Sequence, residues 1–256
     1  MRSLPTAMAE QAGAGAVTAG TATGSLDVRL ASTVGTLAVR DGRWSVTLTA
    51  TDPSGDAPEE LTADAVVLTA PAPQSVALLR TGAGLASEAT LAQLSAVTYA
   101  PSLTVLARPV DRTVADLPEP DPRDHADALV RVLDNGRTGA SPVVALTLQP
   151  NAAFSARHLD GDRDAAARIL VEQASARVGT SLEVVHVHGW RYAQVMRGID
   201  AAALRDDTSG APLVLAGDLF ASHDDAPADL ELEGVERAYL SGTAAAALLV
   251  DGSGRT

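Results

Sequence analysis

The sequence contains no cysteine and no lysine, and each absence excludes particular chemistries. Without cysteine the chain cannot form disulfides, thiolate metal sites, a cysteine nucleophile or a cysteinyl link to a cofactor. All 19 basic residues are arginines, which excludes Schiff-base catalysis and the phosphate-binding lysine of P-loop enzymes. Several classes of covalent and phosphate-binding enzyme are therefore ruled out.

Positive charge and long apolar runs are also scarce. The formal net charge is −13, a sign that repels duplex nucleic acid and anionic membranes. No apolar run reaches the ~18 to 20 residues of a membrane span, the nearest being 238–250. The opening MRSLPTAMAEQ lacks the apolar region of a signal peptide. We therefore expect a cytoplasmic protein with no nucleic-acid and no membrane partner.

What is present is the composition of a folded protein. Apolar residues make up 46% of the chain and charged residues 20%, close to ordinary globular values. A length of 256 residues allows one large domain or two small ones, with a full hydrophobic core.

Two apolar segments, 65–70 and 213–218, run on without polar alternation. Such runs are typical of strands that are covered on both faces, as in a parallel sheet. The sequence therefore predicts that these two strands are neighbours in one sheet.

The region before the first of these segments has a different pattern. Apolar and polar residues alternate over 26–30 and 44–49, and Asp41-Gly42 is a strong hairpin signal, which predicts a small antiparallel meander over 26–50. A short helix is expected within 4–17, and a polar loop over 51–60.

The region between the two apolar segments reads as an inserted α+β domain. The patterns predict helical pieces within 74–94, an amphipathic helix over 162–178 and strands over 97–107, 128–133, 143–148 and 182–192. The predicted fold class is α/β, with one domain made of 1–78 and 206–256 and a substrate-binding domain over 79–205.

Four short segments occur in a fixed order along the chain. They are 65–74 (AVVLTAPAPQ), 189–193 (GWRYA), 215–218 (LAGD) and 234–247, which begins GVERAYLSG. In this order they resemble the later portion of the renalase-like branch of the flavin-containing amine oxidases. The resemblance implies an FAD/NAD(P)-binding Rossmann-like domain, incomplete here, interrupted by the substrate domain, with FAD at their interface.

The resemblance also implies an activity and a substrate class. Members of this family transfer a hydride from a small molecule, a dihydronicotinamide or an amine, to the flavin, which O2 then reoxidises. The cofactor carries out the difficult step, and the protein supplies placement and electrostatics. The absence of lysine favours the renalase-like branch over true monoamine oxidases.

The family assigns cofactor contacts to residues in both halves of its first domain. By resemblance, Val34 meets the adenine, and Thr69, Ala70 and Pro71 line the dinucleotide. Asp218 would hold ribityl or pyrophosphate-side hydroxyls. Independently of the family, Gly217 permits close backbone approach, and Asp218 follows a buried strand where α/β sheets place ligand contacts.

The last helix is expected to begin near Ala238, with its positive end directed at the flavin. Glu236, Arg237 and Ala238 are its cofactor-side candidates. Trp190 and Tyr192 lie two apart on a strand and share a face, which by resemblance looks into the substrate pocket. The alternative for this pair is an aromatic core position. No catalytic residue is identified.

The sequence departs from the family in two places. Gly13 and Gly15 are followed by Thr18, with no strand before them, so a strand and Gly-x-Gly-x-x-Gly loop for the pyrophosphate is lacking. Met1 resembles an internal methionine, which implies that the first βαβ unit is missing. Arg237 stands where the family has glycine. We therefore expect this chain alone to bind FAD poorly or not at all and to be poorly active.

The alternative is a non-enzymatic remnant or partner subunit. A missing βαβ unit would leave the strand at 66–69 with an unpaired apolar edge, open to self-association or a second chain. A hydrolase is disfavoured because no Gly-x-Ser-x-Gly elbow is present. His186 and His188 share a strand face but lack a third ligand, and His223 lies in an acidic loop, so no metal site is expected.

Overall fold

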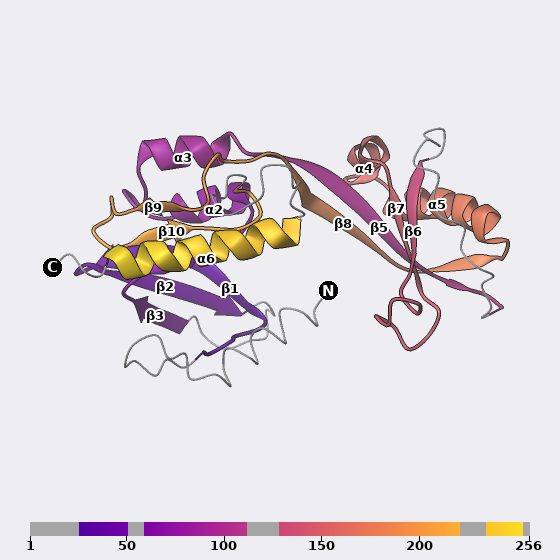
Figure 1. Cartoon of the computed structure of the whole chain (residues 1–256), viewed down its shortest axis with the longest axis horizontal. Coiled ribbons are helices and arrows are strands. Elements are labelled where there is room, and N and C mark those ends of the chain that lie inside the picture. Colours follow the sequence, from indigo (N-terminus) through magenta and orange to yellow (C-terminus); the bar gives the residue numbers. More distant parts are fainter. Residues whose placement is uncertain (1–25, 51–58, 112–127, 221–233, 253–256) are drawn as a thin grey trace.

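The computed structural model describes residues 26–50, 59–111, 128–220 and 234–252. These residues form two lobes joined by a pair of long strands (Figure 1). Three sheets are present in this part of the chain, and the architecture is mixed α/β. Within the same ranges, no helix combines the length and apolar character needed to cross a membrane.

The first lobe contains an antiparallel three-stranded sheet of order β1-β2-β3. Its strands are β1 (Ser32–Arg40), β2 (Arg43–Ala50) and β3 (Glu59–Ala63). The predicted turn is confirmed: Asp41 and Gly42 have positive φ angles of 52° and 74° and join Arg40 to its partner Arg43. The meander is thus present, but with different limits.

The strand predicted over 26–30 is wrong. Those residues are exposed and outside any strand. The two-residue turn fixes the hairpin register, so the strand that pairs with β2 is the segment adjacent to the turn. This register buries Leu37 and Trp44, which supply the hairpin's core contacts. The predicted loop at 51–60 ends earlier, since β3 begins at Glu59.

The second sheet of this lobe has the order β4-β10-β9. Its strands are β4 (Val66–Leu68), β10 (Leu213–Leu215) and β9 (Leu204–Asp206). β4 and β10 are parallel, with Val66 opposite Leu213, so the two apolar segments are neighbours as predicted. β10 is buried on both faces: Leu213 and Leu215 join the main core, and Val214 packs on the opposite side.

Three helices cover this sheet (Figure 1). They are α2 (Ala72–Leu79), α3 (Glu88–Ser95) and α6 (Gly234–Gly252). Pro71 precedes α2, and the Ser87 side chain caps α3 by accepting from the Thr90 N–H at 3.1 Å. α6 packs on the Val214 side and begins four residues before the expected Ala238. The helix predicted within 4–17 lies outside the described residues.

The second lobe is a four-stranded antiparallel sheet with helices on one face. The strand order is β6 (Leu129–Asp134), β7 (Leu146–Pro150), β5 (Thr98–Pro109) and β8 (Leu182–Arg197). The helices are α4 (Ala152–His158) and α5 (Arg163–Val178), capped by the Asn151 and Asp162 side chains. These elements match the predicted order of strands and helix.

The long strands β5 and β8 pass from one lobe into the other (Figure 1). At one end Tyr99 and Val195 pack against the first lobe's core, while Leu103 and Val105 belong to the second. Leu85 and Leu94 lie in the first core together with Leu37. The proposed domain limits at 79 and 205 stay a prediction.

Candidate functional site

A cleft of about 950 Å³ lies where the lobes meet. The bare face of the second-lobe sheet forms one wall, and Asp218 and the first turn of α6 form the other. Figure 1 shows that α6 points its starting end toward β8. The polar and aromatic residues of the lining are Ser102, Thr104, Arg131, Gln149, Trp190, Tyr192, Gln194, Asp218 and Arg237.

The two predicted pocket aromatics lie on this wall. Trp190 and Tyr192 alternate along β8 and both line the cleft. Trp190 is 53% exposed, so much of its ring remains available for contact. Tyr192 packs edge to face against Tyr99, with ring centroids 5.3 Å apart. Trp190 and Tyr192 therefore form an aromatic wall of the cleft, and Tyr99 supports this wall through its contact with Tyr192.

Tyr99 connects this aromatic wall to the first lobe. Its phenolic oxygen accepts a hydrogen bond of 2.9 Å from the Ala72 N–H, at the start of α2. Burial raises the pKa of Tyr99, and the nearby Asp218 carboxyl adds to the rise. Tyr99 thus stays protonated at neutral pH and fixes the angle at which β5 enters the first lobe.

Asp218 follows β10 at the carboxyl end of the parallel pair. It is half-buried, and burial raises the pKa of its carboxyl, while the positive charge of Arg237 acts in the opposite direction. A Cβ added at Gly234 would lie 3.9 Å from its carboxylate oxygen, so the start of α6 is close. Among the described residues Asp218 forms no salt bridge within 4.0 Å, which leaves its carboxylate available to a ligand.

Gly217 fixes the strand end against α6. Its φ is +130°, a value that side-chain-bearing residues rarely adopt, and a Cβ there would lie 3.6 Å from the Thr69 carbonyl oxygen. Its N–H donates to the Oγ of the fully buried Ser241 at 3.0 Å. This hydrogen bond holds α6 in place, and sequence reasoning missed Ser241. The sequence did contain a signal for it: Ser241 is a polar residue one helical turn before Ala245, on the face of the helix that is buried.

Arg237 lies in the first turn of α6 and lines the cleft. Its Nε atom is buried and has no hydrogen-bond partner among the residues that the structure describes. A buried donor without an acceptor costs free energy, on the order of 1–3 kcal/mol. This atom is therefore a position at which a ligand oxygen would be stabilised.

The other predicted cofactor residues do not line the cleft. Val34 is on β1 and is 39% exposed. Thr69 is exposed, and the carbonyls of Ala70 and Pro71 accept hydrogen bonds from the first turn of α2. Glu236 is exposed, and Ala238 is half-buried.

Several cleft residues were missed at the sequence level. Ser102 and Thr104 alternate with the buried Leu103 and Val105 along β5, so the period-two pattern already placed them on the bare face. Arg131, Gln149 and Gln194 come from three separate strands. Only the strand order brings them together.

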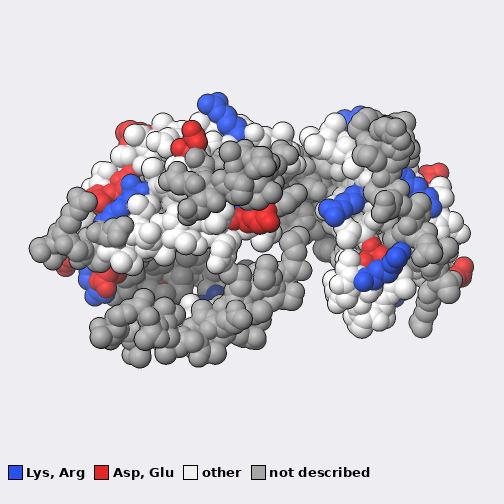
Figure 2. Space-filling view, in the orientation of Figure 1, with Lys and Arg blue, Asp and Glu red and all other residues white. Residues whose placement is uncertain are grey.

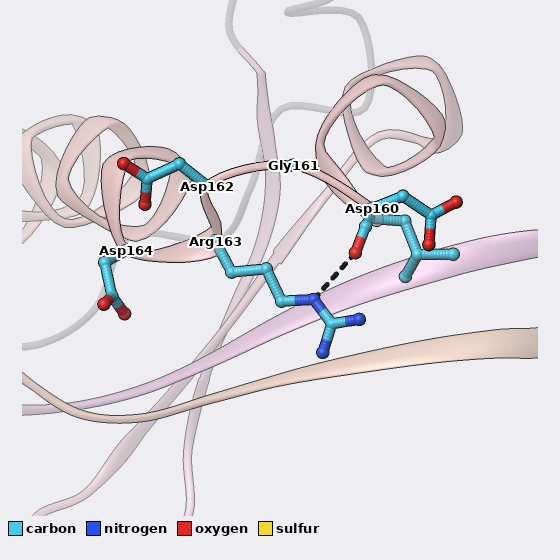
Figure 3. A pocket seen from close by; sticks show the side chains of 6 residues that line it. Asp160, Gly161, Asp162, Arg163 and Asp164 are labelled. Atoms are coloured by element: carbon cyan, nitrogen blue, oxygen red, sulfur yellow. Dashed lines mark hydrogen bonds between the residues drawn. The ribbon is translucent and has the colours of Figure 1, made fainter.

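A second hollow, of about 480 Å³, lies at the turn between α4 and α5 (Figure 3). Three of its four charged residues have partners. Arg163 Nε donates to the Leu159 carbonyl at 2.7 Å, Asp162 caps α5, and Asp160 pairs with Arg191. A Cβ at Gly189 would lie 2.8 Å from the Leu159 side chain, so this turn packs directly on β8. The arrangement serves packing between helix and strand.

The two strand histidines lie beyond the cleft. His186, His188 and Trp190 form a row on one face of β8, with ring centroids 6.1 Å and 4.3 Å apart. Within the ranges that the structure covers, no group of three metal-ligating side chains occurs. His223 lies outside the described residues. On the face shown in Figure 2, arginines and carboxylates are interspersed over the described parts of both lobes.

The described residues thus form a two-lobed α/β protein with a cleft at the junction of the lobes. The solved structures of similar fold include a protein from Exiguobacterium sp. 255-15 that bears the provisional name protoporphyrinogen oxidase. The TM-score is 0.54 at 16% identity, over 88% of this chain and 48% of that one. This chain thus spans about half the length of that oxidase.

A second similar structure is a CLA-producing fatty acid isomerase from P. acnes. Its TM-score of 0.41, at 15% identity over 63% of this chain and 35% of that one, does not establish a shared fold. No family model matches the sequence, and no curated protein matches it either. The comparisons therefore show a likeness of fold.

Proposed function

We propose that the chain belongs to a flavin-dependent oxidoreductase that oxidises a small molecule at the cleft. The parallel pair β4 and β10 carries this proposal, because its carboxyl ends, the start of α6 and the bare face of the second sheet converge there. Its support is the sequence resemblance to flavin-containing amine oxidases and the fold likeness to a structure named as an oxidase. The finer assignment is the renalase-like branch, with a dihydronicotinamide or an amine as substrate.

The residues present fit FAD at this junction. Asp218 lines the cleft and offers a carboxylate that can accept hydrogen bonds from ligand hydroxyls. A cleft of about 950 Å³ is within the usual size of cofactor sites. When bound, the flavin would supply hydride acceptance and, through reoxidation by O2, turnover.

The chain's own residues would bind and orient the reactants. Trp190 and Tyr192 form an aromatic wall against which a ligand ring can pack. The amino end of α6 and Arg237 place positive charge beside Asp218, which stabilises negative charge on a neighbouring ligand. No described side chain is assigned a proton transfer.

An FAD titration of the purified protein tests this proposal. We expect quenching of flavin fluorescence, with binding weakened by about tenfold in Asp218→Ala because a charge-assisted hydrogen bond is lost. Asp164→Ala, at an exposed position of α5, is the matched control and should leave binding unchanged. If FAD binding is saturable but equally tight in Asp218→Ala, the flavin binds at a different place in the chain. A lack of binding at any concentration contradicts a flavin site in this chain.

A partner subunit is the second candidate, and the edge position of β4 favours it. Among the described strands β4 pairs with β10 alone. The Val66 N–H and the Leu68 C=O both bond toward β10, so the peptide groups of Val67 between them face the outer edge. Val67 is 42% exposed. We propose that this edge accepts a strand, from a second copy or from another chain that supplies a βαβ unit.

Light scattering over a range of concentrations tests self-pairing at this edge. We expect the wild-type chain to dimerise and Val67→Pro, which lacks the donor, to remain monomeric. Circular dichroism checks that the variant is folded. A wild-type monomer at every concentration excludes pairing with a second copy. If the chain binds no flavin when the N-terminal unit of a relative is added, pairing with a supplied βαβ unit is excluded.

A further inference from the structure

The charged groups of the cleft are unlike those of the whole chain. The chain has a net charge of −13, yet the described charged residues of the lining are two arginines, Arg131 and Arg237, and one carboxyl, Asp218. This local excess of positive charge lies beside the aromatic wall. It bears on which small molecule the proposed enzyme accepts.

Arg237 is the residue best placed to meet a ligand. Its Nε is buried without an acceptor, and no salt bridge to Asp218 within 4.0 Å is present among the described side chains. A guanidinium presents its donors in a planar fork that matches a carboxylate. An oxygen anion entering the cleft would satisfy the orphaned donor and be attracted by the positive end of α6.

The same residues disfavour a cationic ligand. An amine would have a single counter-ion among the described lining residues, Asp218, and the positive charge of Arg237 already acts on that carboxyl. Arg131 and Arg237 would repel the amine as well. Between the two charge classes, the cleft selects the negative one.

The apolar part of the ligand can pack against the aromatic wall formed by Trp190 and Tyr192. Trp190 presents an exposed ring on β8, next to Tyr192, and aromatic faces of this kind stack with flat ligands. Gln149 and Gln194 flank this wall with side-chain amides that can both donate and accept. Ring and anionic group would therefore be held by different elements, β8 and α6.

We propose that the small-molecule ligand of this cleft is a flat organic acid whose carboxylate is bound by Arg237 while its ring lies against Trp190. As a substrate class this rests on the proposed oxidoreductase function and excludes the amine named there. As a binding property it does not, because it requires only residues of this chain.

Intrinsic fluorescence gives a direct readout of the cleft. The chain has two tryptophans, and Trp44 is fully buried in the first core, so a bound aromatic probe should quench Trp190 alone. The probes are benzoate, benzamide and benzylamine, which share one ring and carry charges of about −1, 0 and +1 at neutral pH. Trp190→Phe should abolish the signal, and calorimetry with benzoate then reports binding in that variant.

We expect benzoate to bind more tightly than benzamide, and benzamide more tightly than benzylamine. Arg237→Gln should weaken the binding of benzoate by about tenfold, because one charge-assisted hydrogen bond is lost, and should leave the binding of benzamide unchanged. Arg168→Gln, an exposed arginine of α5, is the matched control. Circular dichroism verifies that both variants are folded.

The proposal is overturned if the affinities of the three probes are equal or in the opposite order, or if none of the probes binds. It is also overturned if Arg237→Gln leaves the affinity for benzoate unchanged. FMN and riboflavin, titrated into the same variants, separate a substrate carboxylate from a flavin phosphate. A phosphate preference that depends on Arg237, without selectivity for benzoate, also overturns it. If benzoate binds as expected while FAD does not, this inference holds and the flavin proposal fails.

Discussion

The two lobes build their cores in different ways. The second lobe's core is drawn from one continuous stretch, between Leu103 and Leu182, and its helices cover one face of one sheet. The first lobe's core joins Leu37 to Phe220, and the Trp44 indole N–H donates to the Pro212 carbonyl across 168 residues. The comparison shows that one lobe is defined locally, while the other exists only once the chain has returned to it.

Matched leucine truncations should produce the largest effect and test this comparison directly. Leu148→Ala and Leu215→Ala remove equally buried side chains from the second and first cores. Each should lower the free energy of unfolding by about 2–5 kcal/mol in urea titrations. In hydrogen exchange, Leu148→Ala should expose only second-lobe amides, whereas Leu215→Ala should expose amides from β2 to β10. Equal spreading in both variants would contradict separate cores.

Loss of Asp206 should have the next largest effect, on the first lobe alone. Its carboxylate accepts from the Ser87 N–H at 2.8 Å and the Thr208 N–H at 2.9 Å, tying α3 to the end of β9. Asp206→Ala leaves both donors without this acceptor and should cost about 1–3 kcal/mol in urea unfolding. Asp207→Asn, at a 57% exposed side chain, should have little effect.

The effect of Asp206 should also depend on pH. Burial alone would raise the pKa of Asp206, but hydrogen bonds from Thr208, Thr90 and Ser87 outweigh it and hold the pKa well below the ordinary value. Its contribution is therefore complete above about pH 4 and is lost as pH falls toward the folded pKa. Unfolding at pH 7 and pH 3 should show the wild-type advantage over Asp206→Asn shrinking in acid. A constant difference would contradict this.

Asp218 should give the smallest effect, and of opposite sign. Burial raises the pKa of its carboxyl, so the charged form destabilises the fold at neutral pH, and the penalty disappears below about pH 4. Asp218→Asn should raise the melting temperature slightly at pH 7 and leave it unchanged at pH 3.5. A lower melting temperature at neutral pH would mean that Asp218 has a structural role instead.

Local patterns account for much of the fold. The turn at Asp41-Gly42, helix α5 and the pairing of the two apolar strands were all predicted from local patterns. The error at 26–30 shows the limit of this approach: alternation suggested a strand, but the turn selected the segment next to it.

The site was less accessible to prediction. The structure places Trp190, Tyr192, Asp218 and Arg237 around one cleft. The roles that the family resemblance gives them, Asp218 and Arg237 for the cofactor and the two aromatics for the substrate, stay a prediction. Arg131, Gln149 and Ser241 could not be found, since their positions depend on strand order and helix docking, which no local pattern specifies. The charge excess of the cleft is likewise invisible to whole-chain composition.

The unbroken passage of β5 and β8 between the lobes governs how the molecule can move. No loop hinge joins the lobes along these strands, but their pairing shifts register between Thr98 and Tyr99 and again between Ala100 and Ser102. Such bulges bend a strand and increase its twist. Opening and closing would therefore occur as torsion of a two-stranded ribbon, which rotates the Trp190 wall past α6 rather than lifting it away.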